Sequence, residues 1–205
     1  MWRETDRLLG AERAKEFWSL YESVRNELGY VDFLVTLARF HERHADTPLA
    51  LDRAILDLPY ERFRYPSSLE VIDALWRVGV PVVLSDGDPA FQPLKVSRAG
   101  IAAAVRGNVL VFAHKDQHLD DIARLFPADR YVAVDDKAEV LARIKSRWGE
   151  RVSTVHVLQG KYADDAFEGP RPDVVIGAIG ELSTLLGTRD ALRVFFEGAS
   201  IGPGG

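Results

Sequence analysis

Five short apolar runs in the last two thirds of the chain constrain its fold more than any other feature. They lie at residues 80–84, Val109–Phe112, 131–134, 152–158 and Val174–Ile176. Stretches with the spacing of helices separate them, among them Ala138–Trp148 and Glu181–Leu186. Short apolar strands that alternate with helices are typical of a parallel sheet with both faces covered. We therefore predict an α/β core over residues 65–188, whose first helix spans 66–77 with Ser67 as its N-cap.

The first quarter of the chain has a helical pattern instead. Its first helix carries apolar residues at three- and four-residue spacing: Phe17, Leu20, Tyr21, Val24 and Leu28. Gly29 is expected to end this helix. Two more helices are predicted, one from Val31 to residues 41–44 and one over 49–58. Residues 1–64 are therefore predicted to form a helical segment, and 189–205 a C-terminal tail. Residues 164–172 are expected to form a loop, and the glycine-rich residues 198–205 to be disordered.

The composition excludes several classes of protein. The chain has 205 residues and no cysteine, so a disulfide framework, a thiolate metal site and a cysteine nucleophile are excluded. Its net charge of −5 argues against a broadly basic surface for nucleic acid. No apolar run approaches the length of a membrane span, and the charged start does not resemble a signal peptide. We expect a cytoplasmic protein without a nucleic-acid or membrane partner.

Polar residues stand directly after three of the predicted strands. They are Ser85-Asp86-Gly87-Asp88 after the first, His114-Lys115 after the second and Asp135-Asp136-Lys137 after the third. The carboxyl ends of parallel strands are where α/β proteins bind ligands. The sequence therefore predicts that a hydroxyl, an ammonium group and paired carboxylates meet at one edge of the sheet.

These residue types suit the recognition of a phosphoryl group. Asp135 and Asp136 can hold Mg²⁺, which prefers oxygen ligands and also takes up phosphate oxygens. Lys115 can neutralise a phosphate as a point charge, and the Ser85 hydroxyl can donate to a phosphate oxygen. Catalysis of phosphoryl transfer consists mainly of such positioning and charge stabilisation.

Each residue also has a purely structural interpretation. The acidic pair Asp135-Asp136 could cap the helix that follows, and Ser85 or Asp86 could be turn residues. Lys115 alone could be solvated. A further pair, His41 and His44, has the spacing of metal ligands on a helix but no identifiable third ligand. The joint placement after three successive strands favours the functional interpretation at the strand ends.

The order and spacing of these motifs resemble the haloacid dehalogenase-like hydrolase superfamily. Val82-Val83-Leu84-Ser85 is similar to its second motif, Lys115 to its third and Val132-Ala133-Val134-Asp135-Asp136 to its fourth. The string over residues 84–95 resembles a bacterial branch of that superfamily. The resemblance implies a Rossmann-like core with a helical cap in residues 1–64, and Mg²⁺-dependent hydrolysis of a small phosphate ester.

The resemblance also implies roles for individual residues. Ser85, with Asp86 and Gly87 beside it, would bind the transferring phosphoryl group. Lys115 would stabilise the phosphate charge, and Lys95 is a second candidate for that role. The carboxylates of Asp135 and Asp136 would hold Mg²⁺.

One motif of the superfamily has no counterpart before the helical segment. That motif is a strand that ends in Asp-x-Asp and supplies the covalent nucleophile. We expect either that the sequence is shortened at its start or that the protein has lost catalysis. A second interpretation places the motif at Asp86-Gly87-Asp88, where Ala90 then stands in place of Thr or Val.

Two further functions remain open at the level of sequence. A catalytically inactive descendant would bind a ligand or a partner chain, and an exposed strand edge could let it self-associate. A receiver-like signalling domain also carries acidic residues and a lysine at its strand ends, but it fits the helical first quarter poorly. The leading prediction is a phosphatase-type hydrolase that acts on a small phosphorylated molecule.

Overall fold

The structure is a computed structural model that describes residues 2–160, 162 and 169–187, with side chains from Glu4 onward. The predicted tail over 189–205 lies outside the described residues, and so does most of the predicted loop over 164–172. The described part of that loop, residues 169–172, belongs to no helix or strand.

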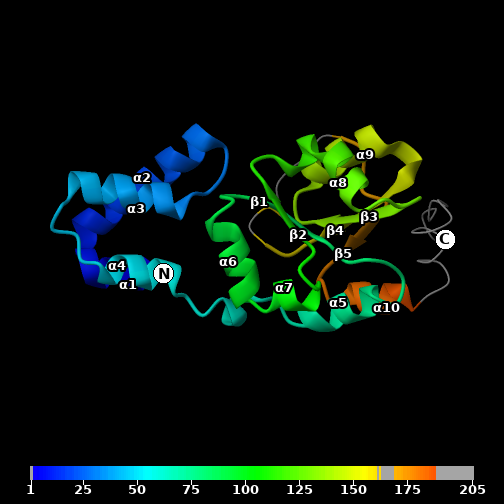
Figure 1. The fold of residues 1–205 in the computed structure, drawn as a ribbon, viewed down its shortest axis with the longest axis horizontal. Helices are drawn as coiled ribbons and strands as arrows, with labels where there is room; N and C mark the ends of the chain where they lie inside the picture. Colours follow the sequence, from blue (N-terminus) through cyan, green and yellow to red (C-terminus); the bar gives the residue numbers. More distant parts are fainter. Residues whose placement is uncertain (1, 161, 163–168, 188–205) are drawn as a thin grey trace. The chain divides into compact units, whose positions relative to one another are not determined.

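Helices and short parallel strands alternate after an all-helical first quarter (Figure 1). In chain order the elements are α1 (Trp2–Leu9), α2 (Ala11–Leu28), α3 (Phe33–Arg43), α4 (Ala50–Leu56), η1 (Tyr60–Phe63), α5 (Ser68–Leu75), β1 (Val83–Asp86), α6 (Phe91–Arg98), α7 (Ile101–Ala104), β2 (Val109–Phe112), η2 (Lys115–Gln117), α8 (Leu119–Leu125), β3 (Tyr131–Asp135), α9 (Ala138–Trp148), η3 (Gly149–Arg151), β4 (Val152–Val157), β5 (Val174–Ile176) and α10 (Glu181–Leu186). The predicted α/β class is confirmed.

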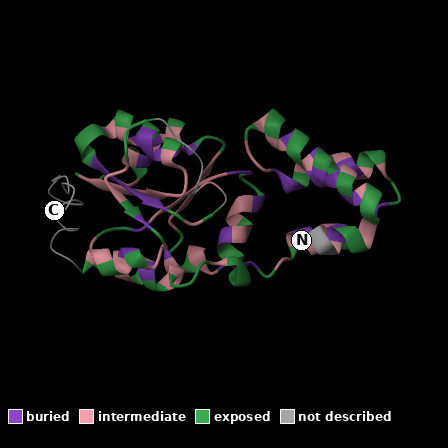
Figure 2. Cartoon of the chain, turned by 180° about the vertical axis from the view of Figure 1, so that it is seen from behind, coloured by how far each residue is buried: buried purple, intermediate pink, exposed green. Residues whose placement is uncertain are grey.

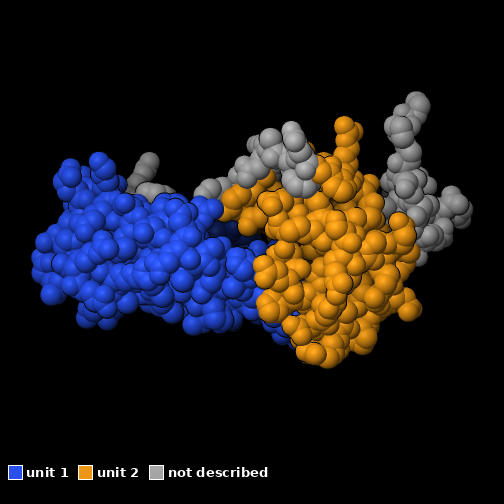
Figure 3. All heavy atoms as spheres, turned by 90° about the horizontal axis from the view of Figure 1, so that it is seen from above, with its two compact units in different colours: residues 1–64, 82–115 blue, residues 65–81, 116–205 orange. Residues whose placement is uncertain are grey.

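The chain divides into two compact units, which Figure 3 colours separately. Unit 1 contains residues 1–64 and 82–115, and unit 2 contains residues 65–81 and 116–205. Unit 1 thus joins the whole helical first quarter to the first two strands. The predicted division into a cap over 1–64 and a core over 65–188 stays a prediction about function.

Unit 1 is organised around an aromatic cluster. Phe17 on α2 packs edge-to-face against Phe40 on α3, with ring centroids 5.3 Å apart. Phe91, the first residue of α6, joins the same cluster through Phe33 and Tyr60, at centroid distances of 6.0 and 6.2 Å. The helix that follows β1 is therefore anchored in the core of the helical segment.

Unit 2 is a three-layer arrangement around the parallel sheet β3-β4-β5. Val71 of α5 and Leu182 of α10 pack with β4 and β5 on one face of the sheet. The helices α8 and α9 lie on the other face (Figure 1). The central strand β4 is buried along its whole length, whereas β3 is half-buried (Figure 2).

The strands are parallel as predicted, but their hydrogen bonds divide them into two ladders. β1 pairs with β2, with Ser85 opposite Val111, and β3 pairs with β4, with Asp135 opposite His156. The sequence prediction treated all five strands as one sheet, because apolar runs reveal strands and not their partners.

The strand positions are close to those predicted. Two strands match the predicted ranges, whereas β1 begins three residues later than predicted and continues to Asp86. β3 is one residue longer than predicted, and β4 one residue shorter. The helix that Gly29 was expected to end does end there, with Gly29 in the left-handed conformation.

The predicted N-cap role of Ser67 is wrong. Ser67 lies at the start of α5, but its backbone is left-handed (φ 63°) and its side chain makes no capping bond. An N-cap side chain reaches the helix amides from an extended backbone, which this residue lacks. Ser68 donates to the Tyr65 carbonyl instead, at 2.6 Å.

Among the described residues, no helix combines the length and the apolar character that a membrane span requires.

The start of β5 is held to β4 by a half-buried polar network. The Asp173 carboxylate accepts hydrogen bonds from the Thr154 N–H at 2.8 Å and the Thr154 hydroxyl at 2.9 Å. The Lys145 ammonium donates to the same carboxylate at 3.0 Å and to the Val152 carbonyl at 2.9 Å. Burial by itself raises the pKa of Asp173, but the bonds from Thr154 and Lys145 outweigh it and hold the pKa below its ordinary value.

We predict that Asp173→Ala lowers the free energy of unfolding by about 1–3 kcal/mol at pH 7, because buried donors lose their acceptor. A carboxyl whose pKa is lowered by folding stabilises the protein above its unfolded pKa of about 3.9. That contribution is lost as the pH falls through the folded value, so the difference between the two proteins should shrink in acid. Urea unfolding at several pH values measures both effects.

The matched control is Asp120→Ala, which removes an exposed ion pair to Arg147. Such surface pairs contribute about 1 kcal/mol or less. Equal losses in the two variants would show that the network around Asp173 does not hold β5.

Candidate functional site

Three of the residues predicted to bind a phosphoryl group, Ser85, Asp86 and Gly87, lie at the carboxyl end of β1 in unit 1. β1 runs parallel to β2 up to Asp86, and the Gly87 N–H extends the ladder by donating to the Phe112 carbonyl at 2.9 Å. The chain then turns at Gly87, against which the Gln92 side chain packs. A Cβ at position 87 would lie 3.3 Å from Gln92. The turn therefore brings the start of α6 back to the end of the strand.

Asp86 connects this strand end to Lys115. Its Oδ1 accepts a hydrogen bond from the backbone N–H of Lys115 at 2.7 Å. Lys115 is 9% exposed, and its ammonium lies 3.5 Å from the Leu84 carbonyl on β1. The structure thus joins two residues predicted from sequence, Asp86 and Lys115, and Ser85 precedes Asp86 on β1.

Asp88 has a structural role at the start of α6. Its two carboxylate oxygens accept from the backbone N–H groups of Ala90, at 2.9 Å, and Phe91, at 2.7 Å. The residue is 6% exposed. Both carboxylates of the Asp86-Gly87-Asp88 string therefore bond to backbone amides.

Lys95 bonds to a residue that the sequence analysis did not single out. Its ammonium donates to Gln92 Oε1 at 2.8 Å, and Gln92 Nε2 donates to Ser85 Oγ at 2.9 Å. Burial lowers the pKa of Lys95, an effect that the charge of Asp88 opposes. Gln92 stands seven residues after Ser85, and its relevance depends on how α6 folds back toward the strand.

The acidic pair lies in unit 2, at the carboxyl end of β3, and is described separately for that reason. Asp135 Oδ1 accepts from the Lys137 N–H at 2.9 Å, and His156 Nε2 lies 3.1 Å from the Asp136 carbonyl. Burial raises the pKa of Asp136, and the neighbouring charge of Asp135 raises it further. Two carboxylates held in this way suit a cation that neutralises both.

Gly160, after β4, packs directly against Asp136. Its φ of +111° is one that side-chain-bearing residues rarely adopt, and a Cβ there would collide with the Asp136 carboxylate. The neighbouring Gln159 accepts from the Ile179 N–H at 2.8 Å, which fixes this loop. Gly160 and Gln159 follow the fourth predicted strand, so the strand-end argument could have found them.

Asp135 and Asp136 are the residues predicted from sequence to hold a metal ion. Within the described ranges, no three His, Cys, Asp or Glu side chains gather as metal ligands. Mg²⁺ often binds through one or two carboxylates and keeps waters or substrate phosphates as its other ligands, so Asp135 and Asp136 fit it. His41 and His44 instead bond to separate carboxylates, Asp52 and Glu16, each at 2.9 Å.

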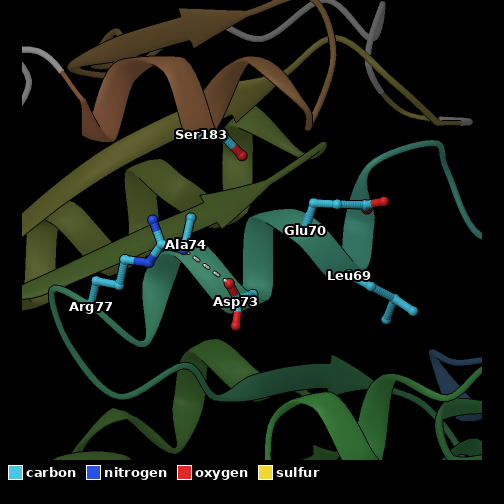
Figure 4. Close-up of a pocket in the computed structure, with 6 residues that line it drawn as sticks. All are labelled: Leu69, Glu70, Asp73, Ala74, Arg77 and Ser183. Carbon is cyan, nitrogen blue, oxygen red and sulfur yellow. Dashed lines mark hydrogen bonds and ion pairs between the residues drawn. The ribbon is translucent and has the colours of Figure 1, made fainter.

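A hollow of about 580 Å³ lies elsewhere on unit 2, along α5 (Figure 4). It is lined by Leu69, Glu70, Asp73, Ala74, Arg77 and Ser183. Arg77 already pairs with Asp73 at 3.3 Å. None of the residues predicted to form the functional site lines this hollow.

Comparison with known proteins yields a structural relative. No family profile matches the chain, and neither does any curated protein. A solved structure from Burkholderia xenovorans LB400, provisionally described as a haloacid dehalogenase-like hydrolase, matches with a TM-score of 0.83. The two sequences are 38% identical, and the match covers 89% of this chain and 85% of the other.

We predict that Gly160→Ala displaces the Asp136 carboxylate and destabilises unit 2. Gly149→Ala is the matched control, because Gly149 also has a positive φ (+56°) but nothing lies within 4 Å of a Cβ there. Backbone strain of about 1–3 kcal/mol is common to both variants, so the excess loss in Gly160→Ala measures the collision. Thermal unfolding of both variants provides the comparison.

Adding Asp136→Ala to Gly160→Ala should recover part of that excess, because the colliding carboxylate is then absent. Fully additive losses in the double variant would contradict the packing of Asp136 against Gly160.

Proposed function

Because the chain belongs to the haloacid dehalogenase-like hydrolase superfamily, we propose that it hydrolyses a small phosphate ester in a Mg²⁺-dependent reaction. The observation that carries the proposal is the hydrogen bond from the Lys115 N–H to Asp86, which holds a buried lysine at the strand end that bears Ser85. A hydroxyl donor and an ammonium group at one strand end suit the three charged oxygens of a phosphoryl group.

The proposal assigns a role to each residue at the end of β1. Ser85 donates its hydroxyl hydrogen bond to a phosphoryl oxygen, and the Gly87 turn lets the backbone approach the phosphate. Lys115 neutralises the charge that develops on the transferring group. Asp86 positions Lys115 through its backbone bond and lies beside the phosphoryl group.

Members of this superfamily generally use a divalent metal ion, and we propose that it is Mg²⁺ here. Asp135 and Asp136 would hold the ion, and a divalent ion supplies positive charge to phosphoryl chemistry. The raised pKa of Asp136 supports this role, because two adjacent half-buried carboxylates gain from a nearby cation. Residues 1–64 are proposed as the cap that selects the substrate.

One observation favours a second candidate function, which is phosphate binding without turnover. The carboxylates of Asp86 and Asp88 both accept hydrogen bonds from backbone N–H groups. Both oxygens of Asp88 bond to amides at the start of α6. The Asp-x-Asp string is therefore poorly suited to provide a nucleophile and an acid–base pair. Under this candidate the chain keeps the phosphate and metal residues and acts by binding.

We predict that the purified chain releases inorganic phosphate from small phosphate esters when Mg²⁺ is present. Ser85→Ala and Lys115→Ala should each lower kcat/KM about a hundredfold, because each removes a donor to the developing charge. Matched controls are Ser97→Ala and Lys15→Ala, which change exposed residues of the same types. Tight phosphate binding without turnover would reject the hydrolase proposal in favour of the binding protein.

Asp86→Asn separates positioning from nucleophilic catalysis. An asparagine oxygen can still accept from the Lys115 N–H, so we predict a loss of about tenfold in kcat/KM. Loss of all activity, with retained thermal stability, would instead identify Asp86 as the nucleophile.

We predict that Mg²⁺ raises the thermal unfolding temperature of the chain through Asp135 and Asp136. A ligand at ten times its Kd stabilises the folded state by about 1.4 kcal/mol. Asp135→Asn should abolish this shift, whereas Asp129→Asn, an exposed aspartate in the same unit, should retain it. An equal shift in both variants would move the metal site away from the acidic pair.

A further inference from the structure

The Ser85 hydroxyl has one proton, and its neighbours determine where that proton points. Gln92 Nε2 donates to Ser85 Oγ at 2.9 Å, so the oxygen is already an acceptor on that side. The hydroxyl must then donate elsewhere, and the Asp86 carbonyl lies at 3.2 Å. A bond of that length is weak for a hydroxyl donor, whose usual distance is about 2.7–2.8 Å. A charged phosphoryl oxygen is a better acceptor and would replace it.

The direction of the Gln92 amide is fixed from its other end by Lys95. An amide group has an accepting oxygen and a donating nitrogen, and only its partners decide which end faces which way. An ammonium group can only donate, so the Lys95 contact at 2.8 Å requires Gln92 Oε1 to face it. The Nε2 end must then face Ser85.

Lys95 is itself held in place. Its ammonium lies 5.8 Å above the ring centroid of Phe91, within the range of a cation–π interaction. Phe91 is 4% exposed and belongs to the aromatic cluster of unit 1. The lysine is therefore half-buried against a buried aromatic ring. This contact holds its ammonium group in position to donate to Gln92 Oε1.

We propose that Gln92 and Lys95 are positioning residues that fix Ser85 as a hydrogen-bond donor to a phosphoryl oxygen. Lys95 orients the Gln92 amide, and Gln92 occupies the acceptor side of the Ser85 hydroxyl. Neither residue touches the phosphoryl group. The inference rests on the proposed phosphate-binding role of Ser85 and extends it to two residues on α6. It differs from a direct role of Lys95 on the phosphate.

Gln92→Glu is the sharpest test. The introduced carboxylate has the shape of the amide but no donor, so it accepts the Ser85 proton and pairs with Lys95. We expect the affinity for inorganic phosphate, measured by calorimetry with Mg²⁺ present, to fall about tenfold, the cost of one hydrogen bond to a charged group. The thermal unfolding temperature should not fall, because the new carboxylate pairs with a half-buried lysine. A residue that only supported the fold would show the opposite pattern.

The same substitution in a Ser85→Ala background excludes simple charge repulsion. If Gln92 acts through the hydroxyl, adding Gln92→Glu to Ser85→Ala causes no further loss of phosphate affinity. A tenfold loss that persists without the hydroxyl would come from repulsion between the carboxylate and phosphate, and it would overturn the inference.

Lys95→Met tests the hydrogen bond between Lys95 and Gln92. It frees the Gln92 amide to turn, so phosphate affinity should fall less than in Gln92→Glu, and the loss should disappear in the Ser85→Ala background. A lysine that bound phosphate directly would cause the same loss with or without Ser85, and that result would overturn the inference. Ser97→Ala, an exposed change on the same helix, is the control and should match the unmodified chain.

Phosphate affinity separates this inference from the proposed hydrolysis. An unmodified chain that binds phosphate without turnover, and shows the predicted dependence on Ser85, supports the positioning role while rejecting the hydrolase. A chain that turns over substrate but is indifferent to Gln92→Glu rejects the positioning role alone. A chain that neither binds phosphate nor hydrolyses esters overturns both.

Discussion

The hydrogen bond between Asp86 and the Lys115 backbone is the interaction on which the candidate site of unit 1 depends. Asp86 is the last residue of β1 and lies opposite Phe112, the last residue of β2. Its Oδ1 lies 2.7 Å from the backbone nitrogen of Lys115, so the bond joins the end of β1 to the segment that follows β2. A carboxylate that accepts from a backbone amide makes a short, directional contact, so the loop that carries Lys115 has one position rather than many. The bond fixes the backbone of Lys115, whose ammonium lies 3.5 Å from the Leu84 carbonyl on β1.

The acidic pair of unit 2 obeys a different constraint. Asp135 and Asp136 lie side by side at a strand end, where burial and mutual repulsion raise the pKa of Asp136. A Cβ at Gly160 would collide with the Asp136 carboxylate, so a side chain fits there only if that carboxylate moves. Replacing one of these carboxylates by a neutral residue would remove the repulsion, and a smaller residue at position 136 would relieve the close packing. Their presence therefore lowers the stability of this strand end, a feature that is common at functional sites.

The sequence predicts the positions of the strands better than it predicts which strands pair with one another. Apolar runs placed all five strands to within three residues, because burial between helices demands apolar side chains in both units. The division of the strands into two ladders could not be predicted, since it depends on contacts distant in sequence. Ser67 shows the same limit locally, because a favourable residue type does not guarantee the backbone conformation that capping requires.

The site residues predicted from sequence are those that a strand position places at a sheet edge, and their roles stay predictions. Asp86 and Lys115 were both predicted from strand ends, and a hydrogen bond joins them. Ser85 precedes Asp86 on β1. The hydrogen bond from Gln92 to Ser85 was not predicted, because it depends on how α6 turns back toward β1. Gly160 was missed because only the first three strand ends were considered.

The helix α6 connects the chemistry of the strand end to the helical segment. Asp88 caps its start, Gln92 and Lys95 lie along one side of it, and Phe91 places it in the aromatic cluster through Phe33 and Tyr60. Phe91 is buried in this cluster, so the packing of the cluster also holds the start of α6. The helical segment and the Ser85 hydroxyl are thus connected through contacts of α6, between residues far apart in sequence.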